Sequence, residues 1–220
     1  MITEMRAAIF DLDGVIVDTA KYHYLAWKRL ANDLGFDFSE HDNERLKGIS
    51  RVRSLEILLE IGGIHLDEAA KNAAADRKNA WYVEYISNME KSEILPGTAE
   101  YLHTIRARGV KIALGSASKN APLILDRLGI TSLFDIIIDG NQVSQAKPHP
   151  EVFLRAASEL GIPPASCIVF EDAKAGIEAA LHAGMGVVAI GKPEMLNQAD
   201  MVIGGLYQLN ILAQTTPPFC

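Results

Sequence analysis

The chain has 220 residues, 49% hydrophobic and 22% charged, a composition typical of a globular protein large enough to bury a substantial core. Its formal net charge of −7 argues against a general nucleic-acid-binding surface, so an anionic ligand would need a local basic pocket. No apolar run approaches the roughly 20 residues that span a bilayer, and the N-terminus lacks the apolar core of a signal peptide, so we expect a cytoplasmic protein without a membrane partner. The two cysteines indicate neither a disulfide framework nor a zinc site.

The first apolar run leads into the stretch IFDLDGVIVDT, residues 9–19, where Asp11 and Asp13 interrupt it. Alternate residues of an extended strand project to the same side, so the two aspartates would point together while Leu12 faces the interior. Paired carboxylates at the end of a strand suggest chemistry. The alternative is an Asp-rich turn closed by Gly14, because Asp and Gly are both common in turns.

The next segment, residues 20–88, is helical in pattern and contains no convincing strand. It is far too long for a simple crossover between two strands. We therefore expect an inserted helical cap domain at residues 18–91, within a core domain made of residues 1–17 and 92–220. The two connections between these domains could act as a hinge.

Five further short apolar runs predict strands, and segments with helical spacing separate most of them: VKIALGSA, FDIIID, SCIVFED, GVVAI and MVIG. Continuous apolar strands are expected when helices cover both faces of a parallel sheet. The predicted fold class is α/β, a Rossmann-like parallel sheet with helices on both faces plus the inserted α-helical cap. Asp172 is expected to cap the helix that follows SCIVFED.

Ligands of an open parallel sheet bind outside the carboxyl ends of its strands. The polar side chains predicted at those ends are Asp11, Asp13, Ser116, Ser118, Asn120, Lys147, Glu171 and Asp172. Each has a structural alternative, such as a helix cap for Ser118 or Asn120 and a solvated loop position for Lys147. Together they offer carboxylates for a hard cation and a nucleophile, with a hydroxyl and an ammonium for phosphate. Phosphoryl transfer needs this set, because Mg²⁺ and a lysine can neutralise the repulsion between a carboxylate and a phosphate.

The motifs DLDGVIVDT, GSASKN, AKPHPEVF and FEDAKAG resemble those of the haloacid dehalogenase superfamily of phosphotransferases, in the same order and over nearly the whole chain. The resemblance implies that Asp11 is the nucleophile that becomes an aspartyl phosphate and that Asp13 is the general acid and base. It also implies that Ser116 and Lys147 bind the transferring phosphoryl group. The implied Mg²⁺ ligands are Asp11, the backbone carbonyl of Asp13, Asp172 and, directly or through water, Glu171.

The cap pieces TAKYHYLAWKRLA, RLKGISRVRSLE and DRKN, together with SASKN, resemble the β-phosphoglucomutase branch of that superfamily. This resemblance implies an isomerase that interconverts β-D-glucose 1-phosphate and glucose 6-phosphate through a phosphoaspartate and β-glucose 1,6-bisphosphate. The alternative is a phosphatase that hydrolyses hexose phosphates. A noncatalytic sugar-phosphate sensor is disfavoured, because both aspartates and the metal-binding acids are intact.

A mutase must hold a bisphosphate in two orientations, which requires a second anion site. The resemblance suggests Arg51, Ser118 and Asn120 for that site, since a guanidinium fork matches phosphate oxygens. The other expected sugar contacts are Ser50, Ser54, Lys78, Ala117, Lys119 and the backbone around Gly48 and Ile49, with Trp27 and Leu46 as an apolar wall. We expect a monomer, because the cap must move and no apolar interface stripe is evident.

Two residues at the start of the cap are expected to respond to its closure. His23 would help to bring Asp13 into line, and Thr19 at the hinge is a candidate gate. The alternatives are ordinary ones: His23 and Trp27 could form a packed helix stripe, and Arg51 and Lys78 could be solvated charges. In one departure from the branch, this chain has Ala173 where a serine is common, which is expected to tune metal affinity.

Overall fold

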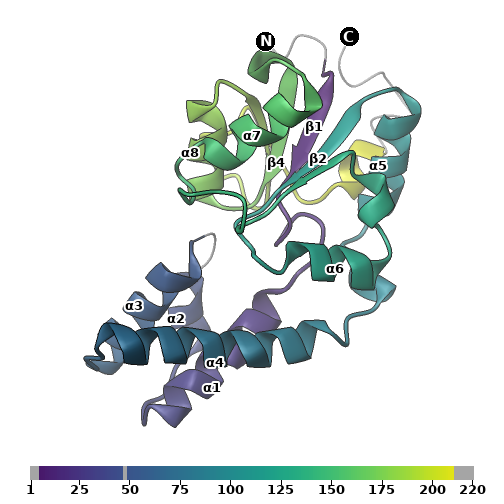
Figure 1. Cartoon of the computed structure of the whole chain (residues 1–220). Helices are drawn as coiled ribbons and strands as arrows, with labels where there is room; N and C mark the ends of the chain where they lie inside the picture. The colour runs from purple at the N-terminus through teal and green to yellow at the C-terminus, as the bar shows by residue number, and fades with distance from the viewer. Residues whose placement is uncertain (1–4, 47–48, 211–220) are drawn as a thin grey trace.

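The centre of the fold is a parallel sheet of six strands, within the residues that the computed structural model describes, 5–46 and 49–210 (Figure 1). The strands are β1 (Ala7–Phe10), β2 (Lys111–Gly115), β3 (Ile136–Ile138), β4 (Cys167–Glu171), β5 (Gly186–Ile190) and β6 (Met201–Ile203). They lie in the order β3-β2-β1-β4-β5-β6, and each neighbouring pair is parallel. Every predicted strand is present, so the predicted fold class is confirmed.

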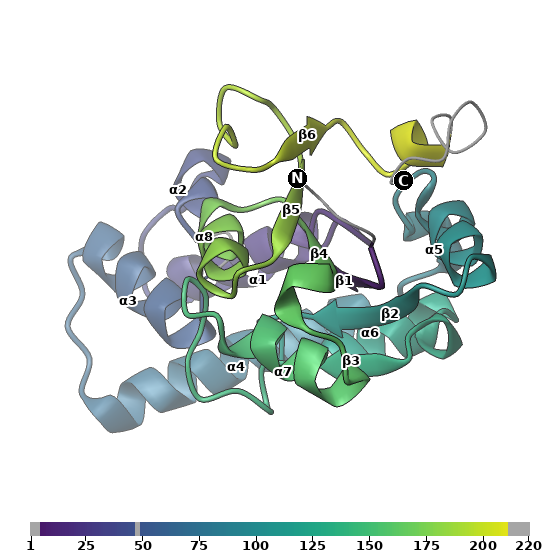
Figure 2. The ribbon, with the colours of Figure 1, turned by 90° about the horizontal axis from the view of Figure 1, so that it is seen from above.

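Helices cover both faces of the sheet, as the continuous apolar strands predict. One face carries α5 (Thr98–Ala107) and α6 (Ala121–Leu128), and the other carries α7 (Glu151–Leu160) and α8 (Lys174–His182) (Figure 2). Alternate residues of β1 divide between two buried clusters: Ala8 and Phe10 pack toward α5 and α6, whereas Ala7 and Ile9 pack toward α7 and α8. Single turns of 3₁₀ helix occur at η1 (Lys91–Glu93), η2 (Thr131–Leu133) and η3 (Pro164–Ser166).

Residues 20–46 and 49–86, which we call the helical unit, lie beyond the carboxyl ends of the strands (Figure 1). Their helices are α1 (Ala20–Asp33), α2 (Glu40–Glu44), α3 (Arg51–Gly62) and α4 (Glu68–Ile86). These helices pack around an apolar cluster of their own that includes Trp27, Leu30 and Leu58. Trp27 is only 2% exposed, which agrees with the alternative prediction that it packs in a helix stripe.

Two connections join the helical unit to the sheet, and they contact each other. The backbone N–H of Leu95, on the returning connection, donates to the carbonyl of Ile16 on the outgoing one at 2.9 Å. The hydroxyl of Tyr22, in the first turn of α1, donates to Glu93 of η1 at 2.6 Å. The helical unit is thus tied to the sheet through a pair of adjacent segments.

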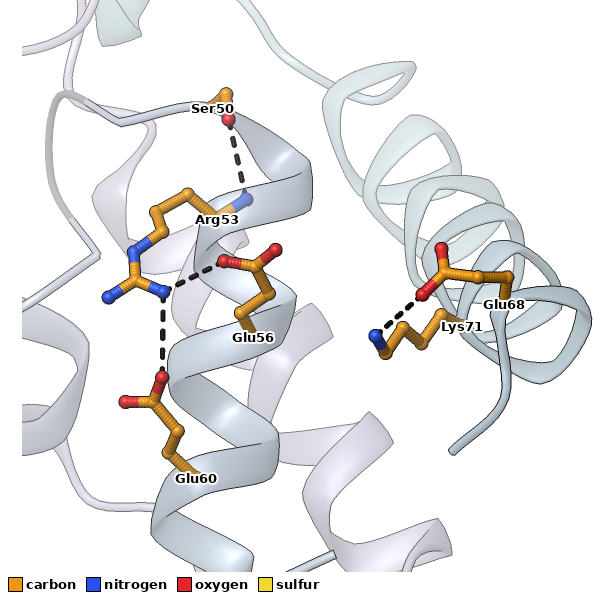
Figure 3. A network of polar contacts seen from close by, with 6 residues as sticks. All are labelled: Ser50, Arg53, Glu56, Glu60, Glu68 and Lys71. Atoms are coloured by element: carbon orange, nitrogen blue, oxygen red, sulfur yellow. Dashed lines mark hydrogen bonds and ion pairs between the residues drawn. The ribbon is translucent and has the colours of Figure 1, made fainter. Parts of the chain in front are cut away.

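The outer surface of the helical unit carries ion pairs within single helices. Arg53 pairs with Glu56 at 2.8 Å and with Glu60 at 3.5 Å on α3, and Lys71 pairs with Glu68 at 2.7 Å on α4 (Figure 3). Pairs between exposed side chains contribute about 0–1 kcal/mol each. We therefore assign these charges to local helix stability.

One predicted helix start is wrong. Ala173, not Asp172, is the N-cap residue of α8, and it makes no side-chain capping hydrogen bond. The carboxylate of Glu171 instead accepts hydrogen bonds from the backbone N–H groups of Asp172 at 2.7 Å and Ala173 at 2.9 Å. The Asp172 side chain is therefore not used as a cap. Within the described part of the chain, no helix combines the length and apolar composition needed to cross a membrane.

Candidate active site

Three carboxylates meet at the carboxyl ends of the two central strands. Asp11 follows β1, and its backbone N–H donates to the carbonyl of Phe170 in β4 at 2.9 Å. Glu171 is the last residue of β4, and Asp172 follows it. Because β1 and β4 are neighbours in the sheet, one oxygen from each of the three side chains lies within 4.8 Å of the others.

Lys147, from the connection between β3 and α7, enters this acidic cluster. Its Nζ lies 2.5 Å from Oδ1 of Asp11 and 2.6 Å from Oε1 of Glu171, and the side chain is buried. Burial by itself would lower the pKa of Lys147, but the charges of Asp11 and Glu171 raise it above its ordinary value. Lys147 is therefore a fixed cation, and its predicted alternative as a solvated loop residue is wrong.

The cluster holds more negative charge than one lysine can neutralise. Burial raises the pKa of Asp11 to about 7 despite the opposing charge of Lys147. Burial, followed by the charge of Glu171, raises the pKa of Asp172 to about 8. A divalent cation would relieve this repulsion, and carboxylate oxygens are the donors that Mg²⁺ prefers. The residues present therefore fit a magnesium ion.

Two glycines allow the acids to approach so closely. At Gly14, where φ is 75°, an added Cβ would lie 2.0 Å from Oδ2 of Asp172. At Gly176, in the first turn of α8, an added Cβ would lie 1.8 Å from Oε1 of Glu171. Any larger side chain at either position would displace one of the clustered carboxylates.

Asp13 has different surroundings from Asp11. Its carboxylate accepts a hydrogen bond from the hydroxyl of Thr19, a fully buried residue at the start of α1. Burial raises the pKa of Asp13 to about 6, and the hydrogen bond from Thr19 opposes the rise. The two aspartates of the DLD motif thus have different partners. Asp11 contacts Lys147, whereas Asp13 contacts Thr19 at the entrance to the helical unit.

A group of cationic and aromatic side chains lies in the helical unit. The Nζ of Lys78, which is 2% exposed, lies 2.9 Å from Nδ1 of His23 and 4.5 Å from the centre of the Trp27 ring. Burial, followed by the charge of Arg51, lowers the pKa of Lys78 well below its ordinary value. Burial and Lys78 likewise lower the pKa of His23. The alternative of Lys78 as a solvated charge is therefore wrong.

The loop after β2 is held by a series of short-range hydrogen bonds. Oγ of the buried Ser116 accepts from the backbone N–H of Ser118 at 3.1 Å, and Oγ of Ser118 accepts from the backbone N–H of Asn120 at 3.2 Å. The Asn120 amide donates to Oδ1 of Asn79 on α4 at 3.0 Å. Although Asn120 is the N-cap residue of α6, its side chain makes no capping hydrogen bond.

The other residues predicted to contact the sugar also have local surroundings that the structure describes. Leu46 and Ser54 are buried, Ile49 packs against the apolar cluster of the helical unit, and Oγ of Ser50 caps α3 by accepting from the backbone N–H of Arg53. In the loop after β2, Lys119 is exposed and Ala117 is partly buried. Gly48 lies outside the described residues.

Two residues without a predicted role, Asn79 and Tyr82, lie beside these groups. The ring of Tyr82 stacks on His23 with ring centres 4.1 Å apart, and Asn79 contacts Asn120. Asn79 belongs to the DRKN motif, and Tyr82 lies one helical turn after Lys78. Helical spacing alone does not distinguish these positions from exposed ones, since their partners come from elsewhere in the chain.

Comparisons with known proteins agree with this architecture. Residues 5–184 match the family described as haloacid dehalogenase-like hydrolase. A β-phosphoglucomutase of Bacillus subtilis is 45% identical over 90% of this chain and 89% of its own length. A phosphorylated carbohydrates phosphatase of Thermotoga maritima is 32% identical over 82% of each chain.

A solved structure extends the agreement to three dimensions. The crystal structure of a β-phosphoglucomutase from Clostridium difficile is 44% identical, covers 96% of both chains and superposes with a TM-score of 0.90. The family predicted from the four sequence motifs is thereby confirmed. With its acids, lysine and sheet order in the arrangement described above, the chain belongs to the haloacid dehalogenase-like hydrolase family.

Proposed function

We propose that this protein is a β-phosphoglucomutase, an isomerase that interconverts β-D-glucose 1-phosphate and glucose 6-phosphate through β-glucose 1,6-bisphosphate. The observation that carries the proposal is the pairing of two sites: the acidic cluster with Lys147 at the sheet, and the buried cationic group of the helical unit. Similarity to β-phosphoglucomutases over nearly the whole chain supports it.

Asp11 is the proposed nucleophile. One of its oxygens attacks the phosphorus of the bisphosphate, an O–P bond forms, and the bond between phosphorus and the sugar oxygen breaks. Lys147 and Ser116 hold the transferring group and offset its charge. Mg²⁺, held by Asp11, Asp172, the backbone carbonyl of Asp13 and Glu171, would neutralise charge on the phosphoryl group and keep Asp11 ionised.

Asp13 is the proposed proton carrier. As a carboxylic acid it gives its proton to the departing sugar oxygen, and as a carboxylate it takes a proton from the sugar hydroxyl that reclaims the phosphoryl group. Its pKa of about 6 keeps both forms accessible near neutral pH. Thr19 holds this side chain at the entrance to the helical unit, which supports its role as a gate.

The second phosphate is proposed to bind between Arg51, whose charge acts on Lys78, and the loop residues Ser118 and Asn120. Nζ of Lys78 contacts the imidazole of His23 and the rings of Trp27 and Tyr82. A buried cation with such neighbours is costly, so an arriving anion would be stabilised strongly. Residues 18–91 would then act as a cap domain that closes over the sugar and excludes water from the phosphoaspartate.

A product assay tests the proposal. Each anomer of glucose 1-phosphate is incubated with enzyme and Mg²⁺, with and without glucose 1,6-bisphosphate, and both glucose 6-phosphate and inorganic phosphate are measured. The β anomer should give glucose 6-phosphate, with bisphosphate accelerating the reaction, and Asp11→Asn should form no phosphoenzyme. Release of phosphate without isomer would favour the sugar phosphatase, the activity for which the Thermotoga maritima relative is named.

A further inference from the structure

Asn79 of α4 connects the helical unit to the loop that follows β2. Its Oδ1 accepts a hydrogen bond of 3.0 Å from Nδ2 of Asn120, across 41 residues of sequence. Asn79 is partly buried, whereas Lys78 beside it is fully buried and turns toward His23. Neighbouring residues of one helix thus serve two different contacts, one within the helical unit and one to the sheet domain.

The contact continues into the loop as a chain of hydrogen bonds. Asn120 donates its backbone N–H to Ser118, and Ser118 donates its backbone N–H to Ser116. Ser116 is 1% exposed and follows the last residue of β2, beside the strand that leads to Asp11. A continuous set of polar contacts therefore runs from α4 to the residue proposed to bind the transferring phosphoryl group.

The partner of Asn120 also decides how its amide is oriented. An Asn side chain has two N–H donors on one arm and an acceptor oxygen on the other. In the structure Oδ1 of Asn79 accepts one N–H of Asn120, so the donor arm of Asn120 faces α4. The same nitrogen carries a second N–H, which can donate to an anion.

We infer that Asn79 is a positioning residue for the second phosphate of the substrate, acting through Asn120. When the helical unit lies against the loop, Asn79 holds the Asn120 amide with its donor arm in place. The affinity for a ligand with a distal phosphate then depends on the position of the cap. The inference rests on the proposed function, and it adds a cap residue whose role is separate from the cationic group around Lys78.

A comparison between a ligand that carries a distal phosphate and a phosphoryl donor that lacks one tests this role. Asn79→Ala should raise the KM for β-glucose 1-phosphate roughly two- to tenfold, the range for loss of one hydrogen bond, with a smaller change in kcat. Phosphorylation of Asp11 by acetyl phosphate, which has no distal phosphate, should stay within about twofold of the unaltered enzyme. Asn72→Ala is the matched control, because Asn72 lies two turns earlier on the same side of α4 and is exposed.

A double-mutant cycle then asks whether Asn79 acts through Asn120. Binding of glucose 6-phosphate is measured calorimetrically for Asn79→Ala, Asn120→Ala and the double variant, all in an Asp11→Asn background. If the inference is right, the double variant loses little more affinity than Asn120→Ala alone. Independent losses that multiply, or equal slowing with acetyl phosphate, would overturn it. Failure of the unaltered enzyme to make glucose 6-phosphate would instead count against the proposed function. The binding cycle would still test whether Asn79 acts through Asn120.

Discussion

Lys147 and Asp11 form a buried ion pair in which Nζ and Oδ1 are 2.5 Å apart. The same ammonium contacts Glu171, so a single cation contacts the proposed nucleophile and a proposed metal ligand. This places Lys147 where it can hold the transferring phosphoryl group and limit the repulsion between carboxylates.

Lys147→Met should lower kcat by at least about a hundredfold, the loss typical of removing one group that stabilises charge in a transition state. It should also lower the free energy of unfolding, more at pH 8 than at pH 6, because Asp11 and Asp172 ionise in the unaltered protein with pKa values of about 7 and 8, and Lys147 stabilises the charge that they then carry. Steady-state kinetics and urea unfolding measure the two effects. Lys192→Met, at an exposed position, should change neither.

Gly176→Ala should abolish most activity without unfolding the protein. Alanine favours a helix over glycine by about 1 kcal/mol, but its Cβ would push the Glu171 carboxylate away from Lys147. Gly161→Ala provides the contrast: this glycine has φ of 68° and open space around it, so the change should reduce stability and spare activity. Equal activity in the two variants, measured beside their melting temperatures, would contradict the close-approach argument.

Tyr22→Phe should destabilise the protein by about 0.5–1.5 kcal/mol, because it removes the 2.6 Å hydrogen bond between α1 and η1. Lys21→Met removes the neighbouring ion pair to the same Glu93, but Lys21 is 55% exposed, so its effect should be within about 1 kcal/mol. Chemical denaturation measures both. The ratio of phosphate released to isomer formed should rise in Tyr22→Phe if the connection controls cap closure, and an unchanged ratio would argue against that control.

Without divalent metal, the contribution of Asp11 and Asp172 to the free energy of unfolding should fall as pH rises from about 4 to about 8. The folded-state pKa values of Asp11, about 7, and Asp172, about 8, lie above the ordinary value of 3.8. A raised pKa stabilises the protonated folded state, and that stability is lost progressively as pH rises from the ordinary value to the folded value. His23 has the opposite shift, from an ordinary 6.5 downward, so its contribution is lost only at lower pH.

Addition of Mg²⁺ should reverse this loss. A metal concentration of 100 times Kd would add about 2.7 kcal/mol if the ion binds only the folded state. Unfolding curves in EDTA and in Mg²⁺, recorded across this pH range, provide the measurement. Asp172→Asn should flatten the pH dependence in EDTA and weaken the response to Mg²⁺, and an unaltered slope in that variant would contradict the assignment.

Much of the fold follows from local patterns in the sequence. The six apolar runs became the six strands of the described chain, because residues buried between two layers of helices must be apolar along their whole length. The acids and Lys147 meet because parallel strands end at one edge of the sheet, which the order of motifs is sufficient to predict. Helix stops at Gly129 and Gly161 were also predictable, since both adopt positive φ values.

Tertiary structure decided which partner each polar side chain has. Asp172 resembles a helix cap in sequence, yet Glu171 satisfies the neighbouring backbone amides. Lys78 and Asn79 are adjacent polar residues in one motif, but the first is buried against His23 and the second contacts Asn120. Local spacing sets the face of a helix on which a residue lies. Burial and hydrogen-bond partners depend on segments brought together from tens of residues away, so they emerge only when the chain is folded.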